Sequence, residues 1–259
     1  MRAIRVILAA VLLAGCASPA SAPRPARSAH PAAPGTRILY LARGRSRPLP
    51  TTLWYPADLA GRHPIILFSH GLGGLPAQFA PIAATWVAAG FVVAAPAYPH
   101  TNGTVRVDDG DIRNQPADAA YVLRMVCRLN TAPGDPLRGH LAVDDLAAVG
   151  FSAGATTTLG LFTAHHDKAL RAAVSVAGRR PGTAFGGSAA PMLFLHGDRD
   201  PVVPIAAGRA AYRAVPWPKR FVTVGGEGHG QYLNPGDPGY PRASALILDF
   251  LRAHLTPAG

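Results

Sequence analysis

The sequence predicts an α/β domain with a doubly wound, mainly parallel sheet. Strand-like and helix-like segments alternate through most of the 259 residues, which is the order that produces parallel strands joined by helical crossovers. Several strand-like segments are continuously apolar, as expected for strands that are covered on both faces. A hydrophobic content of 49% is enough for one substantial core, so we expect a single domain with helices on both faces of the sheet.

The first residues have the pattern of an export signal. Arg2 and Arg5 precede the apolar run Val6 to Leu13, which is too short to span a bilayer as a mature helix. The run ends in Leu-Ala-Gly-Cys, which resembles the lipobox of a bacterial lipoprotein. The resemblance implies a signal peptide over residues 1–15, cleavage before Cys16 and lipidation of the Cys16 thiol.

An ordinary secretory signal, cleaved near Ala20 or Ala22, is the alternative. Lipidated Cys16 would anchor the protein to a membrane of the bacterial cell envelope, whereas the alternative would leave a secreted or periplasmic protein. Residues 16–35 are rich in Pro, Ala, Ser and Arg without periodicity, so we expect a disordered tether. We expect the α/β domain to occupy residues 36–259.

Charge and cysteine content limit the possible partners. The net charge is +11, or +9 without the two signal arginines (11 − 2). Such a balance attracts anionic lipid or polymer surfaces, although high-GC coding also favours Arg and Ala. The absence of a basic and aromatic stripe argues against nucleic acid as a partner. With Cys16 lipidated, Cys127 has no cysteine to pair with, and its apolar helical surroundings predict a buried small side chain.

The first half of the domain begins with two strands that we expect to be antiparallel. They cover residues 37–42 and 51–55 and are separated by a stretch rich in Arg, Gly and Pro. A buried strand over 64–68 leads into the segment Ser-His-Gly-Leu-Gly-Gly. After it we expect a helix over 77–89, a buried strand over 91–95, a polar loop over 98–111 and an amphipathic helix over 113–129.

The second half continues the alternation. An apolar run from Leu146 to Val149 is followed by Gly-Phe-Ser-Ala-Gly and a helix. The connection between the next two strands consists of small residues, so we expect no helical lid and an open cleft, unless the loop 98–111 covers it. The remaining elements are strands over 172–176, 191–195 and 221–224 and helices over 203–215 and 243–254.

The pattern Gly150-Phe151-Ser152-Ala153-Gly154 predicts a nucleophile elbow, the sharp turn between a strand and a helix. The two glycines fit a turn in which the strand and helix backbones pass close together. A serine hydroxyl needs a base to take its proton and an acid to orient that base. Asp200 and His229 follow two later strands, in the chain order Ser, Asp, His that this elbow requires.

Together these segments resemble the α/β-hydrolase superfamily. More narrowly, the chain resembles the dienelactone-hydrolase-like and platelet-activating-factor-acetylhydrolase-like serine esterases, to which bacterial polyester-cleaving cutinases are structurally related. The resemblance rests on the segments Leu53 to Ala57, Phe68 to Gly74, Gly150 to Gly154, Gly197 to Pro204 and Gly228 to Gly230. It implies an α/β-hydrolase fold without a large lid domain, and no cofactor.

The resemblance also implies roles for individual residues. Ser152 would be the nucleophile, His229 the general base and Asp200 the carboxylate that orients His229. The amides of Leu72 and Ala153 would form the oxyanion hole. Dienelactone hydrolases proper use a cysteine nucleophile, and the serine of this chain favours ordinary esters.

Several residues near these positions have competing interpretations. Asp198 competes with Asp200, and the position in the motif favours Asp200. His229 is interpreted as functional because glycines flank it after the last strand. Glu227 is interpreted as a solvated loop charge and His70 as a structural support of the oxyanion loop.

A metal site is not expected. Adjacent histidines at His165 and His166, next to Asp167, point about 100° apart on a helix, and no second ligand cluster accompanies them. Aromatic and histidine side chains in the later loops either line the substrate cleft or pack in the ordinary way. These candidates for substrate binding are Tyr98, His100, Trp217 and Tyr232.

We therefore expect a serine hydrolase that cleaves carboxylic esters with short or accessible acyl groups through an acyl-enzyme. A phospholipid acetylhydrolase or a polyester hydrolase is the alternative within catalysis. A non-catalytic envelope lipoprotein that uses the fold for binding is the alternative of another class, and the set Ser152, Asp200 and His229 argues against it. The sequence leaves the acyl preference and the oligomeric state open.

Overall fold

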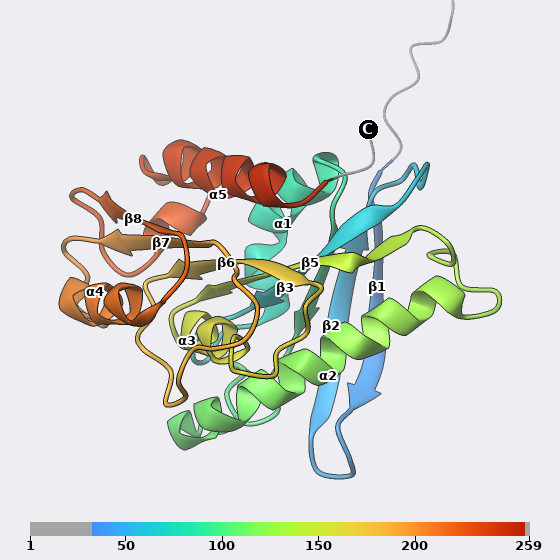
Figure 1. Cartoon of the computed structure of the whole chain (residues 1–259), viewed down its shortest axis with the longest axis horizontal. Coiled ribbons are helices and arrows are strands. Elements are labelled where there is room, and N and C mark those ends of the chain that lie inside the picture. Colours follow the sequence, from blue (N-terminus) through green and yellow to red (C-terminus); the bar gives the residue numbers. More distant parts are fainter. Residues whose placement is uncertain (1–32, 257–259) are drawn as a thin grey trace, which may run out of the picture. The chain divides into compact units, whose positions relative to one another are not determined.

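The computed structural model describes residues 33–256. Within this range eight strands form one sheet in the order β1-β2-β4-β3-β5-β6-β7-β8 (Figure 1). β2 is antiparallel to both β1 and β4, and the other neighbours are parallel, which confirms the predicted sheet. The strands are β1 (Gly35–Ala42), β2 (Pro48–Tyr55), β3 (His63–Ser69), β4 (Val92–Pro96), β5 (Leu141–Phe151), β6 (Leu170–Val176), β7 (Met192–Gly197) and β8 (Lys219–Val224).

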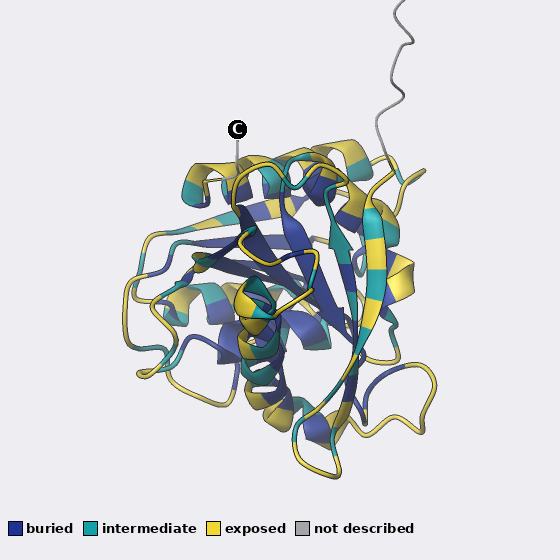
Figure 2. Ribbon diagram, turned by 90° about the vertical axis from the view of Figure 1, so that its right-hand side faces the viewer, coloured by how far each residue is buried: buried dark blue, intermediate teal, exposed yellow. Residues whose placement is uncertain are grey.

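Helices cover both faces of the sheet, as predicted. Two of them, α1 and α5, pack on one face, and α2, α3 and α4 pack on the other (Figures 1 and 2). The expected antiparallel pair of strands is present at one end of the sheet as β1 and β2. The described α-helices are α1 (Ala80–Ala88), α2 (Gln115–Arg128), α3 (Ala153–Gly160), α4 (Ile205–Ala214) and α5 (Tyr240–His254).

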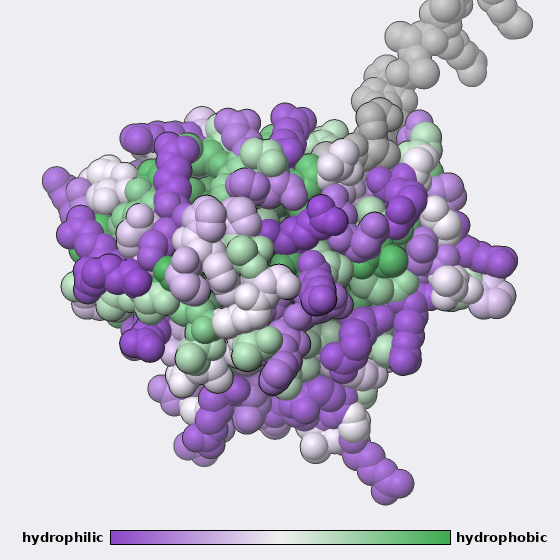
Figure 3. All heavy atoms as spheres, viewed as in Figure 1, coloured by the Kyte–Doolittle hydropathy of each residue, from purple (hydrophilic) through white to green (hydrophobic). Residues whose placement is uncertain are grey.

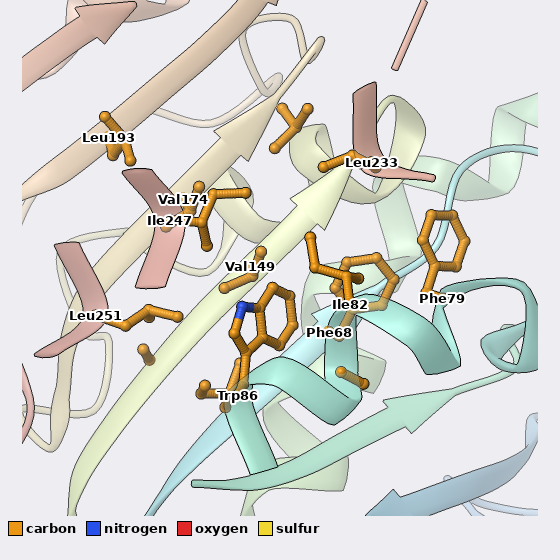
Figure 4. Close-up of a cluster of buried hydrophobic side chains, with 14 of the residues drawn as sticks. Phe68, Phe79, Ile82, Trp86, Val149, Val174, Leu193, Leu233, Ile247 and Leu251 are labelled. Atoms are coloured by element: carbon orange, nitrogen blue, oxygen red, sulfur yellow. The ribbon is translucent and has the colours of Figure 1, made fainter. Parts of the chain in front are cut away.

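The two cores arise from the alternation of side chains along each strand. In β3, Ile66 and Phe68 belong to the cluster under α1 and α5, whereas Ile65 and Leu67 belong to the cluster under α2, α3 and α4. Burying each such side chain stabilises the fold by about 1.5–3 kcal/mol. Figure 4 shows the first cluster, in which Trp86 of α1 lies close to Phe68 and Val149. Further strand residues and residues of α5 continue the cluster: Val174, Leu193, Ile247 and Leu251.

Two helices begin differently from the prediction. The expected helix 77–89 is a 3-10 turn, Pro76–Phe79, followed by α1, and the expected helix 113–129 is preceded by a 3-10 segment, Asp109–Asn114. In both cases proline stands in the first turn of the element, where its missing N–H costs no hydrogen bond.

Strand β5 is longer than predicted because it contains an irregularity. Ala142 pairs with Pro64, and the next pair joins Leu146 to Ile65, so the three residues Val143, Asp144 and Asp145 bulge from the ladder. Two acidic residues in this bulge interrupt the apolar pattern, which explains why the strand is recognisable in the sequence only from Leu146.

Arginines of the first strands have partners inside the domain. Arg47 forms ion pairs with Asp111 and Asp118, at 2.6 and 2.5 Å, and Arg43 pairs with Asp118 at 2.6 Å. Burial alone would raise the pKa of Asp111, but hydrogen bonds from Arg47 and Asn114 lower it below its usual value. These arginines therefore hold the β1–β2 turn to the start of α2, and their charge is largely neutralised within the fold.

The strands define two edges of the sheet. The carboxyl edge is where β3, β5 and β7 end, at Ser69, Phe151 and Gly197, and the amino edge is where they begin. β1 runs in the same direction as β4, so Gly35 lies at the amino edge. The other end of the described chain lies there too, because the amide of Thr256 donates to Asp145 in the β5 bulge (2.8 Å).

Three sequence predictions lie outside the described residues: the signal peptide 1–15, the lipidation site Cys16 and nearly all of the tether 16–35. β1 begins at Gly35, the last residue of the predicted tether. Among the helices of residues 33–256, none combines the length and apolar character needed to cross a membrane. The face of the molecule in Figure 3 is mostly hydrophilic, with apolar side chains scattered in small groups among charged ones.

Candidate active site

Ser152 occupies a strained turn between β5 and α3. Its φ is 55° and its ψ is −118°, a backbone conformation that residues other than glycine rarely adopt. The surrounding glycines make this turn possible. A Cβ on Gly150 would lie 2.2 Å from the carbonyl oxygen of Gly154, and a Cβ on Gly154 would lie 2.0 Å from that of Ser69. The turn thus has the geometry of a nucleophile elbow, with the serine projecting at the carboxyl edge.

Three side chains from three loops at this edge form a continuous chain of hydrogen bonds. His229, in the loop after β8, lies with Nε2 2.8 Å from Ser152 Oγ. Its Nδ1 lies 2.8 Å from Oδ2 of Asp200, in the loop after β7. Since a carboxylate only accepts, Nδ1 carries the proton and Nε2 is free to accept the proton of the serine hydroxyl. The structure therefore brings together Ser152, His229 and Asp200.

Asp200 is held as an anion. Its side chain is buried, and its Oδ1 accepts hydrogen bonds from the amides of Val202 and Val203, both at 2.8 Å. Burial alone would raise the pKa of Asp200, but the bonds from His229 and from these two amides outweigh it and lower the pKa. The competing Asp198 is exposed and accepts from the Gly226 amide instead (2.8 Å), so it links two loops without contacting His229.

His196 is a neighbour of this chain that sequence reasoning missed. Its Nε2 lies 2.8 Å from the carbonyl oxygen of Val203, to which it donates, and 3.3 Å from Asp200 Oδ2. Burial lowers its pKa, so the ring stays neutral. A Cβ on Gly208 would lie 2.2 Å from its Nδ1, so α4 packs directly on the ring. His196 could have been found from its position at the end of an apolar strand, two residues before Asp198.

The residues whose amides are predicted to form the oxyanion hole lie next to Ser152 in the sequence or in a loop that approaches it. Ala153 begins α3, and Leu72 follows Gly71, whose Cβ, if present, would lie 3.3 Å from Ser152 Cβ. Within residues 33–256, neither the Leu72 nor the Ala153 amide donates to a protein acceptor. Two free amides near one serine hydroxyl can donate hydrogen bonds to the negative oxygen of a tetrahedral intermediate.

A cleft of about 230 Å³ opens beside His229. The Phe151 ring lies 5.0 Å from the His229 ring and 5.9 Å from the Phe79 ring, measured between centroids. The cleft is lined by Gln78, Phe79, Phe151, His229, Gly230, Gln231 and Asn234. No helix of the described chain lies between β6 and β7, as expected for an open site.

The four side chains considered for substrate binding have different positions. Tyr98 and Tyr232 have no exposed surface, so neither lines the cleft in this structure. Trp217 lies before β8, at the amino edge, and packs against Phe162 (6.2 Å between centroids). His100 is exposed in the loop after β4, and its carbonyl accepts from the Asp108 amide. Thus the carboxyl edge holds Tyr98, Tyr232 and His100 but not Trp217.

A larger cavity, of about 690 Å³, lies elsewhere, between α2, the segment that follows α3 and the amino ends of β5 and β6. Its lining includes Cys127, whose pKa burial raises to about 11, together with His165, His166 and Asp167. In the part of the chain that the structure describes, no three His, Cys, Asp or Glu side chains are placed to hold a metal ion.

Comparison with known proteins supports the same class of enzyme. A search of curated proteins finds no match. The family model described as PETase, PET hydrolase-like, matches residues 23–229, which is most of the chain and includes the elbow, Asp200 and His229. The chain therefore belongs to the PET hydrolase-like family, carboxylic ester hydrolases of the α/β-hydrolase superfamily.

Proposed function

We propose that this protein hydrolyses polyester chains by way of an acyl-enzyme on Ser152. The observation that carries the proposal is the chain of hydrogen bonds from Ser152 Oγ through His229 to Asp200 at the mouth of an open cleft. Membership of the PET hydrolase-like family supports the substrate class.

In the first half of the reaction, Ser152 Oγ attacks the ester carbonyl carbon while His229 Nε2 takes the hydroxyl proton. The negative oxygen that forms is stabilised by the amides of Leu72 and Ala153, each worth about 3 kcal/mol in the transition state. His229 then returns the proton to the departing alkoxide, and the acyl group stays on Ser152. Asp200 stabilises the positive charge that His229 carries in between.

In the second half, water takes the place of the alcohol. His229 removes a proton from the water while the water attacks the acyl-enzyme. The same two amides donate hydrogen bonds to the second oxyanion. When this intermediate collapses, Ser152 recovers its proton from His229 and a carboxylic acid leaves. No metal or cofactor is needed in these steps.

Exposed apolar side chains around the site support a polymer as the substrate. Leu72, Val105, Val107 and Val202 lie in loops at the carboxyl edge and are between 40% and 58% exposed. Exposed apolar side chains at the same edge as an open cleft can contact an extended apolar chain that a closed pocket would exclude.

The catalytic part of the proposal is tested by labelling with a fluorophosphonate, which reacts with activated serines. We expect the unsubstituted protein to be labelled and to release soluble acids from a polyester film, and Ser152→Ala to do neither. If both proteins are folded and neither is labelled, the fold serves binding instead of catalysis. If both are labelled, another serine is the nucleophile.

The substrate class is tested with a matched pair of surface variants, Val107→Ser and Ile38→Ser. Val107 is 40% exposed at the carboxyl edge, and Ile38 is 52% exposed on β1. We expect Val107→Ser to lower the rate on film by about 3-fold and to leave the rate on a soluble short-chain ester unchanged, because one exposed apolar side chain contributes about 1 kcal/mol or less. Ile38→Ser should change neither rate. Equal effects of the two variants on film would contradict docking at the carboxyl edge.

A further inference from the structure

The Leu72 amide and the Gly71 carbonyl belong to the same peptide bond. Since a trans peptide is planar, its C=O and N–H point in opposite directions, and holding one fixes the other. Here the Gly71 oxygen accepts two hydrogen bonds, from Nδ1 of His70 at 2.7 Å and from the amide of Gly74 at 3.0 Å. These two bonds fix the direction of the carbonyl, and with it the direction of the Leu72 N–H.

The His70 ring is itself fixed from its other side. Its Nε2 accepts from the Tyr98 amide at 3.2 Å, which leaves Nδ1 as the protonated nitrogen that donates to Gly71. The Tyr98 hydroxyl lies 2.8 Å from Ser69 Oγ, and the two rings are 5.3 Å apart between centroids. His70 is buried, and burial lowers its pKa, so the ring keeps the uncharged form that this pair of bonds requires.

Apart from the bonds to Gly71, the loop that carries Leu72 is held beyond Leu72, where the Gly74 carbonyl accepts from the Gly103 amide (3.1 Å). Gly71, Gly73 and Gly74 allow many backbone conformations, and Gly73 adopts a φ of +71°. In such a segment the Gly71–Leu72 peptide can rotate as a unit unless its oxygen is bound. The Gly73 amide donates to the Thr101 carbonyl (2.7 Å), which anchors the loop one peptide further on but does not set the Gly71–Leu72 plane.

We propose that His70 is a positioning residue for catalysis: its Nδ1–H fixes the Gly71–Leu72 peptide so that the Leu72 amide faces the oxyanion, and the Tyr98 amide selects the required tautomer. This inference rests on the proposed ester hydrolysis. It explains why Tyr98 is buried behind the loop instead of lining the cleft. Because the oxyanion forms during the reaction, the contribution of His70 belongs to the transition state and not to substrate binding.

The test compares His70→Asn with His70→Gln in the full chain. The amide nitrogen of asparagine can take the place of Nδ1 and keep the bond to Gly71, whereas glutamine reaches only the place of Nε2. We expect His70→Gln to lower kcat on a soluble ester by about 100-fold with little change in KM, as when an oxyanion donor is lost, and His70→Asn to stay within about 10-fold of the parent. The affinity for a trifluoromethyl ketone, which forms a negatively charged adduct with serine, should fall in parallel with kcat.

His63 supplies the matched control. It is also a buried histidine whose Nδ1 donates to a glycine carbonyl, Gly90, at 2.7 Å, but it lies at the amino edge. His63→Gln should therefore leave kcat unchanged, whatever it does to the melting temperature. A fall in kcat in His63→Gln as large as that in His70→Gln would show a general structural effect and overturn the inference.

The remaining outcomes separate this inference from the proposed function. Equal kcat values for His70→Asn and His70→Gln, or a rise in KM alone, overturn the positioning role while leaving ester hydrolysis in place. An unsubstituted protein whose turnover is no higher than that of Ser152→Ala overturns both proposals.

Discussion

At the carboxyl edge of the sheet, buried polar side chains are joined by hydrogen bonds and stand beside a strained backbone, whereas the amino edge holds the larger cavity. The cleft beside His229 measures about 230 Å³ and the cavity at the amino edge about 690 Å³. The small cleft is lined by His229, which lies within hydrogen-bond distance of Ser152, whose φ is 55°, and of the anion Asp200. The larger cavity adjoins a thiol whose pKa is raised. In the proposed mechanism, fixed polar groups, and not the size of a cavity, determine where the reaction takes place.

The largest expected effect separates the two acidic residues in the loop after β7. In Asp200→Asn, the amide oxygen should still accept the hydrogen bonds from the Val202 and Val203 amides. The NH₂ group would then face His229 Nδ1, which favours the tautomer that carries its proton on Nε2. We expect kcat on a soluble ester to fall by about 10⁴-fold with the fold intact by circular dichroism. The control is Asp198→Asn, which loses only the bond to the Gly226 amide. A comparable loss of activity in the control would mean that Asp198 is the functional carboxylate.

The next effect concerns ion pairs at the two edges. Asp118 has no exposed side-chain surface and binds both Arg43 and Arg47 at the carboxyl edge. Asp118→Asn should lower the free energy of unfolding by about 3 kcal/mol, because it leaves the largely buried Arg47 incompletely paired and removes the partner of the half-buried Arg43. At the amino edge Asp144 pairs with Arg62 in solvent, with the Asp144 side chain 68% exposed. Urea unfolding of Asp144→Asn should show a far smaller change. Similar losses of unfolding free energy in Asp118→Asn and Asp144→Asn would contradict this difference between the two edges.

A smaller effect appears in the pH dependence of stability. Burial lowers the pKa of His70 and of His196 below the usual 6.5. As the pH falls below 6.5, the unfolded chain binds protons that the folded chain does not, so the free energy of unfolding decreases, by at most about 1.4 kcal/mol per pH unit for each group. The carboxylates Asp111 and Asp200, whose pKa values are lowered from 3.8, lose their contribution only at lower pH.

This dependence is measured by urea unfolding at pH values from 7.5 down to 5. We expect stability to fall over this range and His196→Gln to reduce the slope without abolishing it, since His70 and His254, whose pKa burial also lowers, remain. Identical slopes for the parent and the variant would mean that His196 does not resist protonation in the folded protein.

The sequence was sufficient to predict the sheet and the order of its elements. Short continuous apolar runs such as 64–68 and 91–95 are typical of strands that are buried on both faces, and both form such strands. The grouping of Ser152, Asp200 and His229 could also be predicted, because each follows a strand and parallel strands end at the same edge. Trp217 could have been placed by the same rule, since it precedes its strand.

Other features depend on contacts that a local pattern does not contain. Tyr98 and Tyr232 are buried although their hydroxyl groups make them equally suited to a cleft, and only the packing of the loops decides between these positions. The β5 bulge arises from pairing with β3 and has no signal of its own. The partners of Arg47 lie more than sixty residues away in the sequence, as the separation of 64 residues to Asp111 illustrates.

Both ends of the described chain lie at the amino edge, on the opposite side of the sheet from Ser152. A support joined at either end, whether a bead, a filter or a fused protein, would therefore be attached behind the enzyme and leave its working side free to meet a solid material. Immobilisation usually sacrifices part of an enzyme population to unfavourable orientation. For this protein, attachment at Gly35 or at Thr256 would place the support at the amino edge, away from Ser152.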